Sequence, residues 1–388
     1  MKLLFICHLT QHALNDTVRA MRYLGQELVR RGHEVDYFFR RAQPHEPHRP
    51  ISPLEWPVRV APLIRRKCEQ KQYNVILSTG TSGWCLSSFR DWLLPQPTRL
   101  VSWHLKDELS ALPPNPQEAL EAAAPLPASK HQLIEQLSEW TVSQSLKTQD
   151  GCFLTGLEDL HQIRAEFPQY ASKALYQPRG VAAHFYSPQR LMEKTKLPSK
   201  LLLIGNTEHG HPIGDTLAKA FQRIWETHPQ ATLTVAGAKL PQADALFADF
   251  PEPMKPALSA IHIQEEGHLP DLYLQHDVLI QPHPTPGLPL AVLEAMASAM
   301  PAVIAQNPNF QEVVSHYESG MLVPPHDANA LAESVSHLLE NPQLCRDMGE
   351  AAFETVSRCY TWHQVCDIFE ANLTRIVEQS PQSNARPD

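Results

Sequence analysis

The segment 277–305 constrains the fold of this chain more than any other part of the sequence. Residues 278–280 form a short apolar run between polar residues and proline, which is typical of a buried parallel strand. Turn-forming residues occupy 283–287, strong helix formers occupy 290–300, and a second apolar run begins at Pro301. This order of strand, turn, helix and strand predicts a parallel α/β sheet, in which ligands bind beyond the carboxyl ends of the strands.

The N-terminus of the predicted helix offers backbone N–H groups that have no partner within the helix. Such groups bind anions at the edge of a parallel sheet. Glu294 lies about one turn into the helix, on the side that could face the same crevice. The segment therefore predicts a place for an anionic ligand next to an acidic side chain.

Two parts of this segment resemble the C-terminal signature of the GT-B family of retaining glycosyltransferases (glycosyl transferases group 1, family 4-like). They are Gly287-Leu-Pro-Leu-Ala-Val-Leu-Glu-Ala-Met-Ala and Pro301-Ala-Val-Ile. In the family this pattern binds a sugar nucleotide. Three positions differ here, because the first glutamate of the pattern falls on Pro286, the second glycine on Pro289 and the third glycine on Ala299. Pro289 removes one N–H group from the turn that would meet the phosphates.

The resemblance implies how this segment would hold the donor. Glu294 would accept hydrogen bonds from the hydroxyls of the nucleotide ribose. The backbone N–H groups of Gly287, Leu288 and Leu290 would meet the diphosphate at the helix N-terminus.

The donor-phosphate motif of the family is degenerate in this chain. A predicted strand enters a loop at Gly205, where the family reads Gly-Arg-x-x-x-x-Lys-Gly and clamps the diphosphate with the arginine and the lysine. The arginine falls on Asn206 and the lysine on His211. Asparagine is uncharged and histidine is mostly neutral at pH 7, so neither supplies a permanent cation. Arg179, Lys106 or a protonated His211 are alternative cations.

Two further positions are assigned by the resemblance. A strand predicted over 99–104 ends in His104; a lone histidine there is more often structural, but the family has a histidine at this place close to the donor sugar. A strand edge predicted over 262–269 contains Gly267 and His268, where the family seats the nucleotide base on backbone groups.

The N-terminal half also has the pattern of a doubly wound sheet. Residues 3–7 predict a strand, residues 16–31 an amphipathic helix, Gly32 its C-cap and residues 33–39 a second strand. The family usually has a Gly-Gly pair after the first strand, so that the backbone can approach the donor phosphate. In this chain residues 12–15 carry side chains that would hinder that approach.

The resemblance covers nearly the whole chain and implies an α/β protein of the GT-B class, in which two Rossmann-like domains face a central cleft. A segment over 178–188 is similar to the linker of the family and places the domain boundary there. The expected units are an N-terminal acceptor domain (1–177), a C-terminal nucleotide-sugar donor domain (178–365), and a helix that crosses back to the first domain before a disordered tail (366–388).

Composition restricts the class of function. A chain of 388 residues with 43% hydrophobic and 19% charged residues is typical of a soluble protein of two domains, and a formal net charge of −9 argues against nucleic-acid binding. No apolar run is long enough for a membrane span, and the N-terminus does not read as a signal peptide, so a cytoplasmic protein is expected. Seven scattered cysteines indicate reduced thiols, and 20 histidines show no metal-binding spacing.

A predicted helix over 58–71 is basic. Its cationic side chains are Arg59, Arg65, Arg66, Lys67 and Lys71. The simpler interpretation is a solvated helix face. The functional interpretation is a surface that approaches anionic lipid or a phosphorylated acceptor, which would place the protein peripherally at a membrane.

These inferences favour a retaining, metal-independent glycosyltransferase without a bound cofactor, acting in polysaccharide or glycoconjugate biosynthesis. It would move a sugar from a nucleotide-sugar donor to a hydroxyl of a glycan, lipid or small-molecule acceptor. The candidate catalytic residues are His104, Asn206 and His211. Because the clamp is changed, a rival hypothesis is a non-catalytic binding or scaffold subunit with another glycosyltransferase as its partner. A phosphorylase or an epimerase of the GT-B class is the third alternative.

Overall fold

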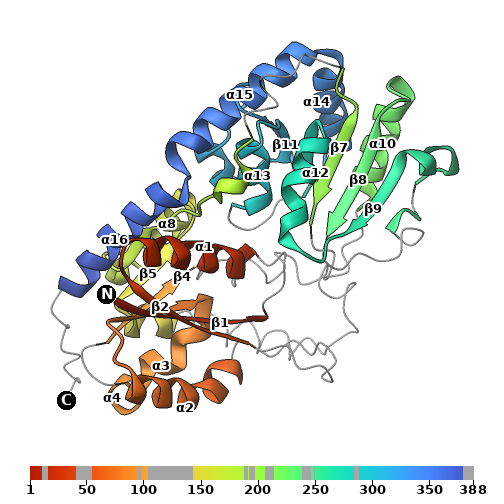
Figure 1. Cartoon of the computed structure of the whole chain (residues 1–388). Helices are drawn as coiled ribbons and strands as arrows, with labels where there is room; N and C mark the ends of the chain where they lie inside the picture. Colours follow the sequence, from red (N-terminus) through yellow and green to blue (C-terminus); the bar gives the residue numbers. More distant parts are fainter. Residues whose placement is uncertain are drawn as a thin grey trace.

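The chain forms two parallel six-stranded sheets, each covered by helices (Figure 1). The structure is a computed structural model. It describes residues 1–10, 16–40, 55–94, 98–103, 143–187, 191, 197–205, 214–237, 246–248, 250–283 and 288–378. Two parallel sheets covered by helices confirm the predicted α/β fold class.

The first sheet has the order β2-β1-β3-β4-β5-β6, and all of its neighbouring strands are parallel. Its strands are β1 (Lys2–Thr10), β2 (Glu34–Arg40), β3 (Val75–Thr79), β4 (Arg99–Trp103), β5 (Gly151–Leu154) and β6 (Ala174–Tyr176). The helices of this half are α1 (Asp16–Arg30), α2 (Glu55–Gln70), α3 (Trp84–Ser88), α4 (Arg90–Leu93) and α8 (Leu157–Glu166). The strands consist largely of buried apolar residues, as parallel strands covered on both faces require.

The second sheet has the order β12-β11-β10-β7-β8-β9 and is also parallel. Its strands are β7 (Lys200–Ile204), β8 (Thr232–Gly237), β9 (Leu258–His262), β10 (Val278–Gln281), β11 (Ala302–Ala305) and β12 (Met321–Val323). The helices of this half are α10 (Gly214–Thr227), α12 (Leu269–Gln275), α13 (Leu290–Ala297), α14 (Ala328–Glu340) and α15 (Pro342–Cys359). The predicted domain boundary at 177/178 falls between β6 and β7 and stays a prediction.

The predicted unit of strand, helix and strand over 277–305 is present as β10, α13 and β11. The helix ends at Ala297 instead of continuing to 300, because Ala299 has a positive φ of 51° and the N–H of Met300 turns back to the carbonyl of Ala295 at 2.9 Å. This left-handed position is where the family pattern has a glycine, so alanine adopts a conformation there that costs it roughly 1–2 kcal/mol.

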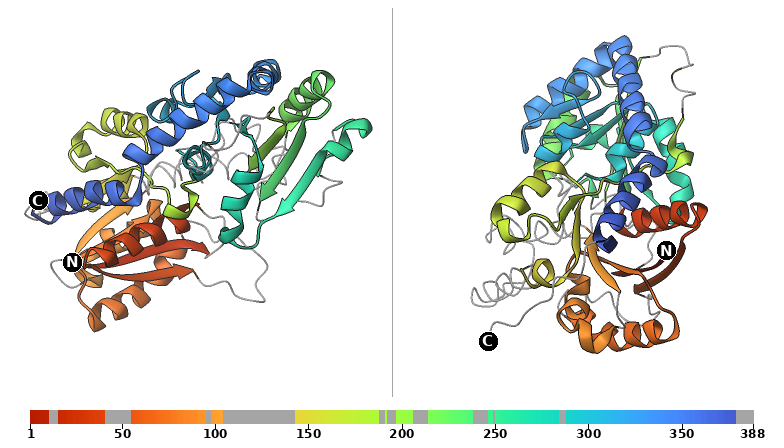
Figure 2. Two further views of the ribbon diagram at one scale, coloured as in Figure 1. Left: turned by 45° about the horizontal axis from the view of Figure 1, so that its top comes forward. Right: turned by 90° about the vertical axis from the view of Figure 1, so that its left-hand side faces the viewer.

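The last helix, α16 (Trp362–Glu378), crosses back from the second half and packs on α1 and the first sheet (Figure 2). The ring of Phe369 lies 5.4 Å from that of Phe153 and 6.5 Å from that of Phe5, centroid to centroid. A single cluster of buried apolar side chains runs from the first sheet through α1 and α16 to α13. The expected crossover helix is therefore confirmed, and it joins the two halves into one apolar core.

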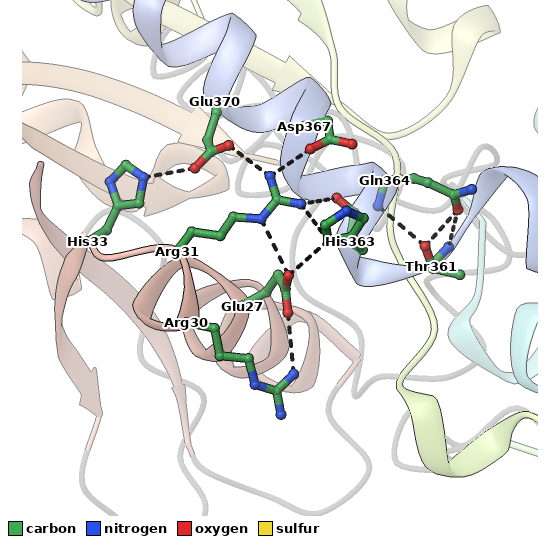
Figure 3. A network of polar contacts seen from close by, with 9 residues as sticks. All are labelled: Glu27, Arg30, Arg31, His33, Thr361, His363, Gln364, Asp367 and Glu370. Atoms are coloured by element: carbon green, nitrogen blue, oxygen red, sulfur yellow. Dashed lines mark hydrogen bonds and ion pairs between the residues drawn. The ribbon is translucent and has the colours of Figure 1, made fainter.

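A group of polar contacts fixes α16 against the end of α1, and Arg31 lies at its centre (Figure 3). Its Nη1 donates to the carboxylates of Asp367 at 2.6 Å and Glu370 at 2.8 Å, and its Nη2 donates to the backbone carbonyl of His363 at 2.6 Å. Its Nε donates to Glu27 at 3.3 Å. The group ties α1 to the crossover helix, so the position of α1 is set by the C-terminal part of the chain.

We expect Arg31→Met to lower the free energy of unfolding by about 2 kcal/mol, because several charge-assisted hydrogen bonds are lost together. The matched control is Arg30→Met. Arg30 is 76% exposed and pairs with Glu27, whereas Arg31 is 16% exposed. The control should change the stability by less than about 0.5 kcal/mol. Urea unfolding followed by circular dichroism measures both variants, and equal effects would contradict the role given to Arg31.

Candidate nucleotide-binding cleft

The structure describes only some of the residues that the sequence assigns to the site. The candidates that lie outside the described residues are His104, Asn206, His211 and Gly287, together with Lys106 and Pro286. Those within it are Gly205, Gly267, His268, Leu288, Leu290 and Glu294. The last three are brought together at the start of α13.

Glu294 lies on α13, a helix that is buried along almost its whole length. Its Oε1 accepts a hydrogen bond from Nη2 of Arg19 on α1, in a buried ion pair between the two halves of the molecule. Its Oε2 accepts from the hydroxyl of Tyr273 on α12 at 2.9 Å. Burial raises the pKa of Glu294 to about 7, with the charge of Asp16 adding to the effect and that of Arg19 opposing it.

Arg19 is the cation at the centre of this cleft. Its Nε donates to Oε1 of Glu266 at 2.8 Å, its Nη1 lies 3.7 Å from Oδ1 of Asp16, and the guanidinium lies over the ring of Phe185. Burial lowers its pKa, but Glu294, Asp16 and Glu266 raise it by more. Arg19 therefore stays charged although it is almost fully enclosed.

Glu266 also contacts two other side chains of α1. The hydroxyl of Tyr23 donates to Oε1 of Glu266, and Nη2 of Arg22 lies 3.7 Å from Oε2. The ring of Tyr23 also stacks on that of Trp362 at the start of α16, with centroids 6.2 Å apart. Glu266 precedes Gly267 directly, so α1 reaches the place that the resemblance assigns to the nucleotide.

The N-terminus of α13 holds an anion that belongs to the chain itself. The N–H of Leu290 donates to Oδ2 of Asp16 at 3.0 Å. Nη1 of the buried Arg179 lies 4.0 Å from the same oxygen and donates to the carbonyl of Leu288 at 3.1 Å. Pro289 is the N-cap residue and has no N–H to offer, so Leu290 supplies the first donor of the helix. A negative group is stabilised here by this donor, by the helix dipole and by a nearby guanidinium.

The predicted strand edge over 262–269 is wrong. The strand β9 ends at His262, and a 3-10 turn spans Glu266–His268, because the chain must enter α12 at Leu269. Gly267 and His268 are both exposed, and a Cβ added to Gly267 would meet open space. Packing in this structure therefore does not require a glycine at position 267.

A small cavity of about 240 Å³ lies beside this turn. It is lined by Ile261, His262, Ile263, His268, Asp271, Leu272 and Gln275. Gly205 directly follows strand β7, and its N–H donates to the carbonyl of Ala236 on β8 at 3.0 Å. The role predicted for Gly205 at the phosphates stays a prediction.

Asp16, Arg19 and Tyr23 were not found by reasoning from the sequence. Their spacing of three and four residues places them on one face of α1, beside the buried apolar stripe. Polar residues beside an apolar stripe are usually expected to be exposed to solvent. A polar i, i+3, i+7 row next to an apolar stripe was the available signal, but its partners lie more than 240 residues away in the chain.

Comparison with known proteins shows what this chain is similar to. A family model described as Glycosyl transferases group 1 matches residues 214–355. The D-inositol 3-phosphate glycosyltransferase of Corynebacterium diphtheriae is 23% identical over 391 residues, which cover 90% of this chain and 87% of that relative. Residues 214–355 are therefore similar to the group 1 glycosyl transferases, and nearly the whole chain is similar to this relative.

Other proteins match the chain in part or in fold alone. A glycogen synthase of Mycobacterium tuberculosis is 28% identical over 170 residues, and the match spans 43% of this chain and only 40% of that relative. The structure of sucrose-phosphate synthase from Thermosynechococcus elongatus has a TM-score of 0.75 at 17% identity and covers 98% of this chain and 100% of its own. HepE of Anabaena in complex with UDP-glucose has a TM-score of 0.67 at 13% identity. The match covers 97% of this chain and 100% of HepE. These likenesses establish the GT-B fold.

Three further properties of the described residues concern metal sites, disulfides and membrane spans. In the part of the chain that the structure describes, no group of three or more His, Cys, Asp or Glu side chains is arranged for a metal ion. All seven cysteines are free thiols, and six of them are buried. None of the described helices has the length and apolar character to cross a membrane.

We expect Arg19→Met to lower the free energy of unfolding by about 3–5 kcal/mol, because the buried Glu294 loses its cation. The double variant Arg19→Met, Glu294→Gln should recover a large part of this loss, since no buried carboxylate then remains at position 294. Arg22→Met is the control; Arg22 is half-exposed and only 3.7 Å from Glu266, so its loss should cost less than about 1 kcal/mol. Denaturant unfolding of the single and double variants measures the coupling energy between Arg19 and Glu294. Strictly additive effects of the two substitutions on the free energy of unfolding would contradict this coupling.

Proposed function

We propose that the protein is a retaining, metal-independent glycosyltransferase that moves a sugar from a nucleotide-sugar donor to an acceptor hydroxyl. The observation that carries the proposal is the start of α13, where the Leu290 N–H holds a carboxylate and Glu294 lies one turn further on. Two relatives of the chain are named as a glycogen synthase and a D-inositol 3-phosphate glycosyltransferase. Among proteins of the same fold, HepE was solved with UDP-glucose and a starch synthase with ADP and acarbose.

In such a transfer the bond between the anomeric carbon and the diphosphate oxygen breaks, and the diphosphate leaves with the electron pair. The acceptor oxygen bonds to the same face of the sugar and gives its proton to the leaving phosphate. Leu290 N–H and the dipole of α13 would stabilise the developing charge, with the guanidinium of Arg179 nearby. Glu294 would hold the ribose hydroxyls. His104, Asn206 and His211 remain candidates for the sugar and the diphosphate, and the donor sugar, the base and the acceptor stay open.

The second candidate function is a non-catalytic subunit that binds another glycosyltransferase. It is favoured by a specific observation: both groups that should meet the nucleotide, the Leu290 N–H and Glu294, already have partners within the chain. The changes at Asn206 and His211 point the same way.

Calorimetric titration with UDP, GDP and ADP tests the two functions against each other. The transferase should bind one of them with a micromolar dissociation constant. Glu294→Gln should weaken this binding about tenfold or more, because a charged acceptor for the ribose hydroxyls is lost. Glu265→Gln, two residues before Gly267 and exposed, is the charge-matched control and should leave the affinity unchanged. If the folded protein binds none of the three nucleotides, the scaffold function replaces the transferase.

Peripheral membrane contact also belongs to this proposal. The predicted basic helix corresponds to α2, and the apolar side chains Val58, Leu63, Phe89 and Trp92 are exposed on α2 and beside or within α4. Arg65 lies over the ring of Trp92, with its Cζ 5.2 Å from the centroid. In Figure 1 both helices lie on the side of the first sheet away from the second domain. Exposed aromatic side chains among arginines are suited to the interface of an anionic bilayer.

We expect the protein to sediment with vesicles that contain phosphatidylglycerol and to remain in solution with phosphatidylcholine vesicles. Trp92→Ala should reduce the bound fraction, because the ring would enter the lipid interface. Leu197→Ala is the matched control, since Leu197 is 70% exposed and Trp92 69% exposed. Equal binding to both kinds of vesicle, or equal effects of the two substitutions, would contradict this contact.

A further inference from the structure

One face of α1 contacts the second domain through three polar side chains. Asp16, Arg19 and Tyr23 lie on this face and contact the N-terminus of α13, Glu294 and Glu266 respectively. Figure 1 shows α1 between the first sheet and the second domain. The contacts are charged or charge-assisted, and each of them uses a group of the second domain that could otherwise meet a ligand.

Asp16 takes the position of a ligand phosphate. Its carboxylate oxygen accepts from the Leu290 N–H at 3.0 Å and lies 4.0 Å from Nη1 of Arg179. A phosphate oxygen requires the same two kinds of donor, a backbone N–H at a helix N-terminus and a guanidinium. Both anions cannot use one N–H group at the same time. The side chain of Asp16 is 35% exposed, so it can leave this position for water without crossing the core.

Arg19 likewise uses a hydrogen-bonding position on Glu294 that a ligand would need. One carboxylate oxygen of Glu294 accepts from Arg19 and the other accepts from Tyr273. A ribose hydroxyl that donates to Glu294 must therefore share or replace one of these donors. Tyr273 belongs to the same domain as Glu294, whereas Arg19 belongs to the opposite one. Separation of the domains would remove Arg19 and Asp16 together, because they lie one turn apart on one rigid helix.

We propose that Asp16 is an intramolecular competitor of the donor diphosphate at the N-terminus of α13, and that Asp16 and Arg19 form a latch that nucleotide binding must open. This inference rests on the proposed transferase function. The latch divides the protein into a closed state, which is the one described here, and an open state that accepts the donor. The apparent dissociation constant of a nucleotide is then its intrinsic value divided by the fraction of open protein.

The test measures the affinity of UDP, GDP, ADP and inorganic pyrophosphate for the full chain and for Asp16→Ala and Asp16→Asn. Removal of the carboxylate should tighten nucleotide binding about tenfold or more, because a charge-assisted hydrogen bond no longer has to be broken. Asp16→Asn should have a smaller effect of the same sign, since its amide oxygen can still accept from Leu290 but carries no charge. Pyrophosphate should gain affinity as well, because the competition concerns the phosphate position.

Asp347→Asn is the charge control. Asp347 is exposed on α15 and is not among the residues that contact Asp16, Arg19 or Glu294, and its neutralisation alters the net charge by the same amount. It should leave all affinities unchanged. If Asp16→Ala folds poorly, as judged from its thermal unfolding midpoint, the isosteric Asp16→Asn provides the comparison.

The outcomes separate the latch from the proposed function. Nucleotide binding that is tighter in the Asp16 variants, and unchanged in Asp347→Asn, supports both the latch and the transferase function. Binding by the full chain that stays equal or weakens in the Asp16 variants overturns the latch and leaves the transferase in place. Equal gains in Asp16→Asn and Asp347→Asn show a general effect of charge and also overturn the latch. If neither the full chain nor any variant binds a nucleotide, the proposed function fails and the latch fails with it.

Discussion

The ion pair between Arg19 and Glu294 is the interaction on which the arrangement of the two domains depends. A guanidinium and a carboxylate that are both withdrawn from water are costly unless each has good partners. Arg19 has three acidic neighbours, and Glu294 has a second donor in Tyr273. The pair is stable only while the domains are in contact, so the same residues that close the cleft make its opening energetically demanding.

The rest of the fold holds α1 in the position that makes this pair possible. The crossover helix α16 packs on the first sheet through Phe369 and is tied to the end of α1 through Arg31. Trp362, at the start of α16, stacks on Tyr23 of α1. A chain of contacts therefore runs from the C-terminal helix to α1, and from α1 to the place where a nucleotide would bind.

Much of the architecture could be predicted from the sequence, because it depends on local patterns. The buried strands on either side of α13 and the first helix follow from apolar periodicity and turn residues, whereas the crossover of the last helix was implied by the family resemblance. The end of α13 was placed too late, since Ala299 adopts a backbone conformation that normally indicates glycine. The strand edge at 262–269 was wrong for a similar reason, because the chain turns early to enter α12.

The contents of the cleft could be predicted only in part. Glu294 and the N-terminus of α13 were identified because they belong to one continuous motif. Their partners Asp16 and Arg19 were missed, because no local pattern reports a contact across 275 residues of chain. The most direct test of the account is a crystal structure of the chain with the nucleoside diphosphate that it binds. We expect a phosphate oxygen on the Leu290 N–H, with Asp16 and Arg19 displaced from the second domain. A bound nucleotide with the bond from Leu290 to Asp16 intact would contradict it.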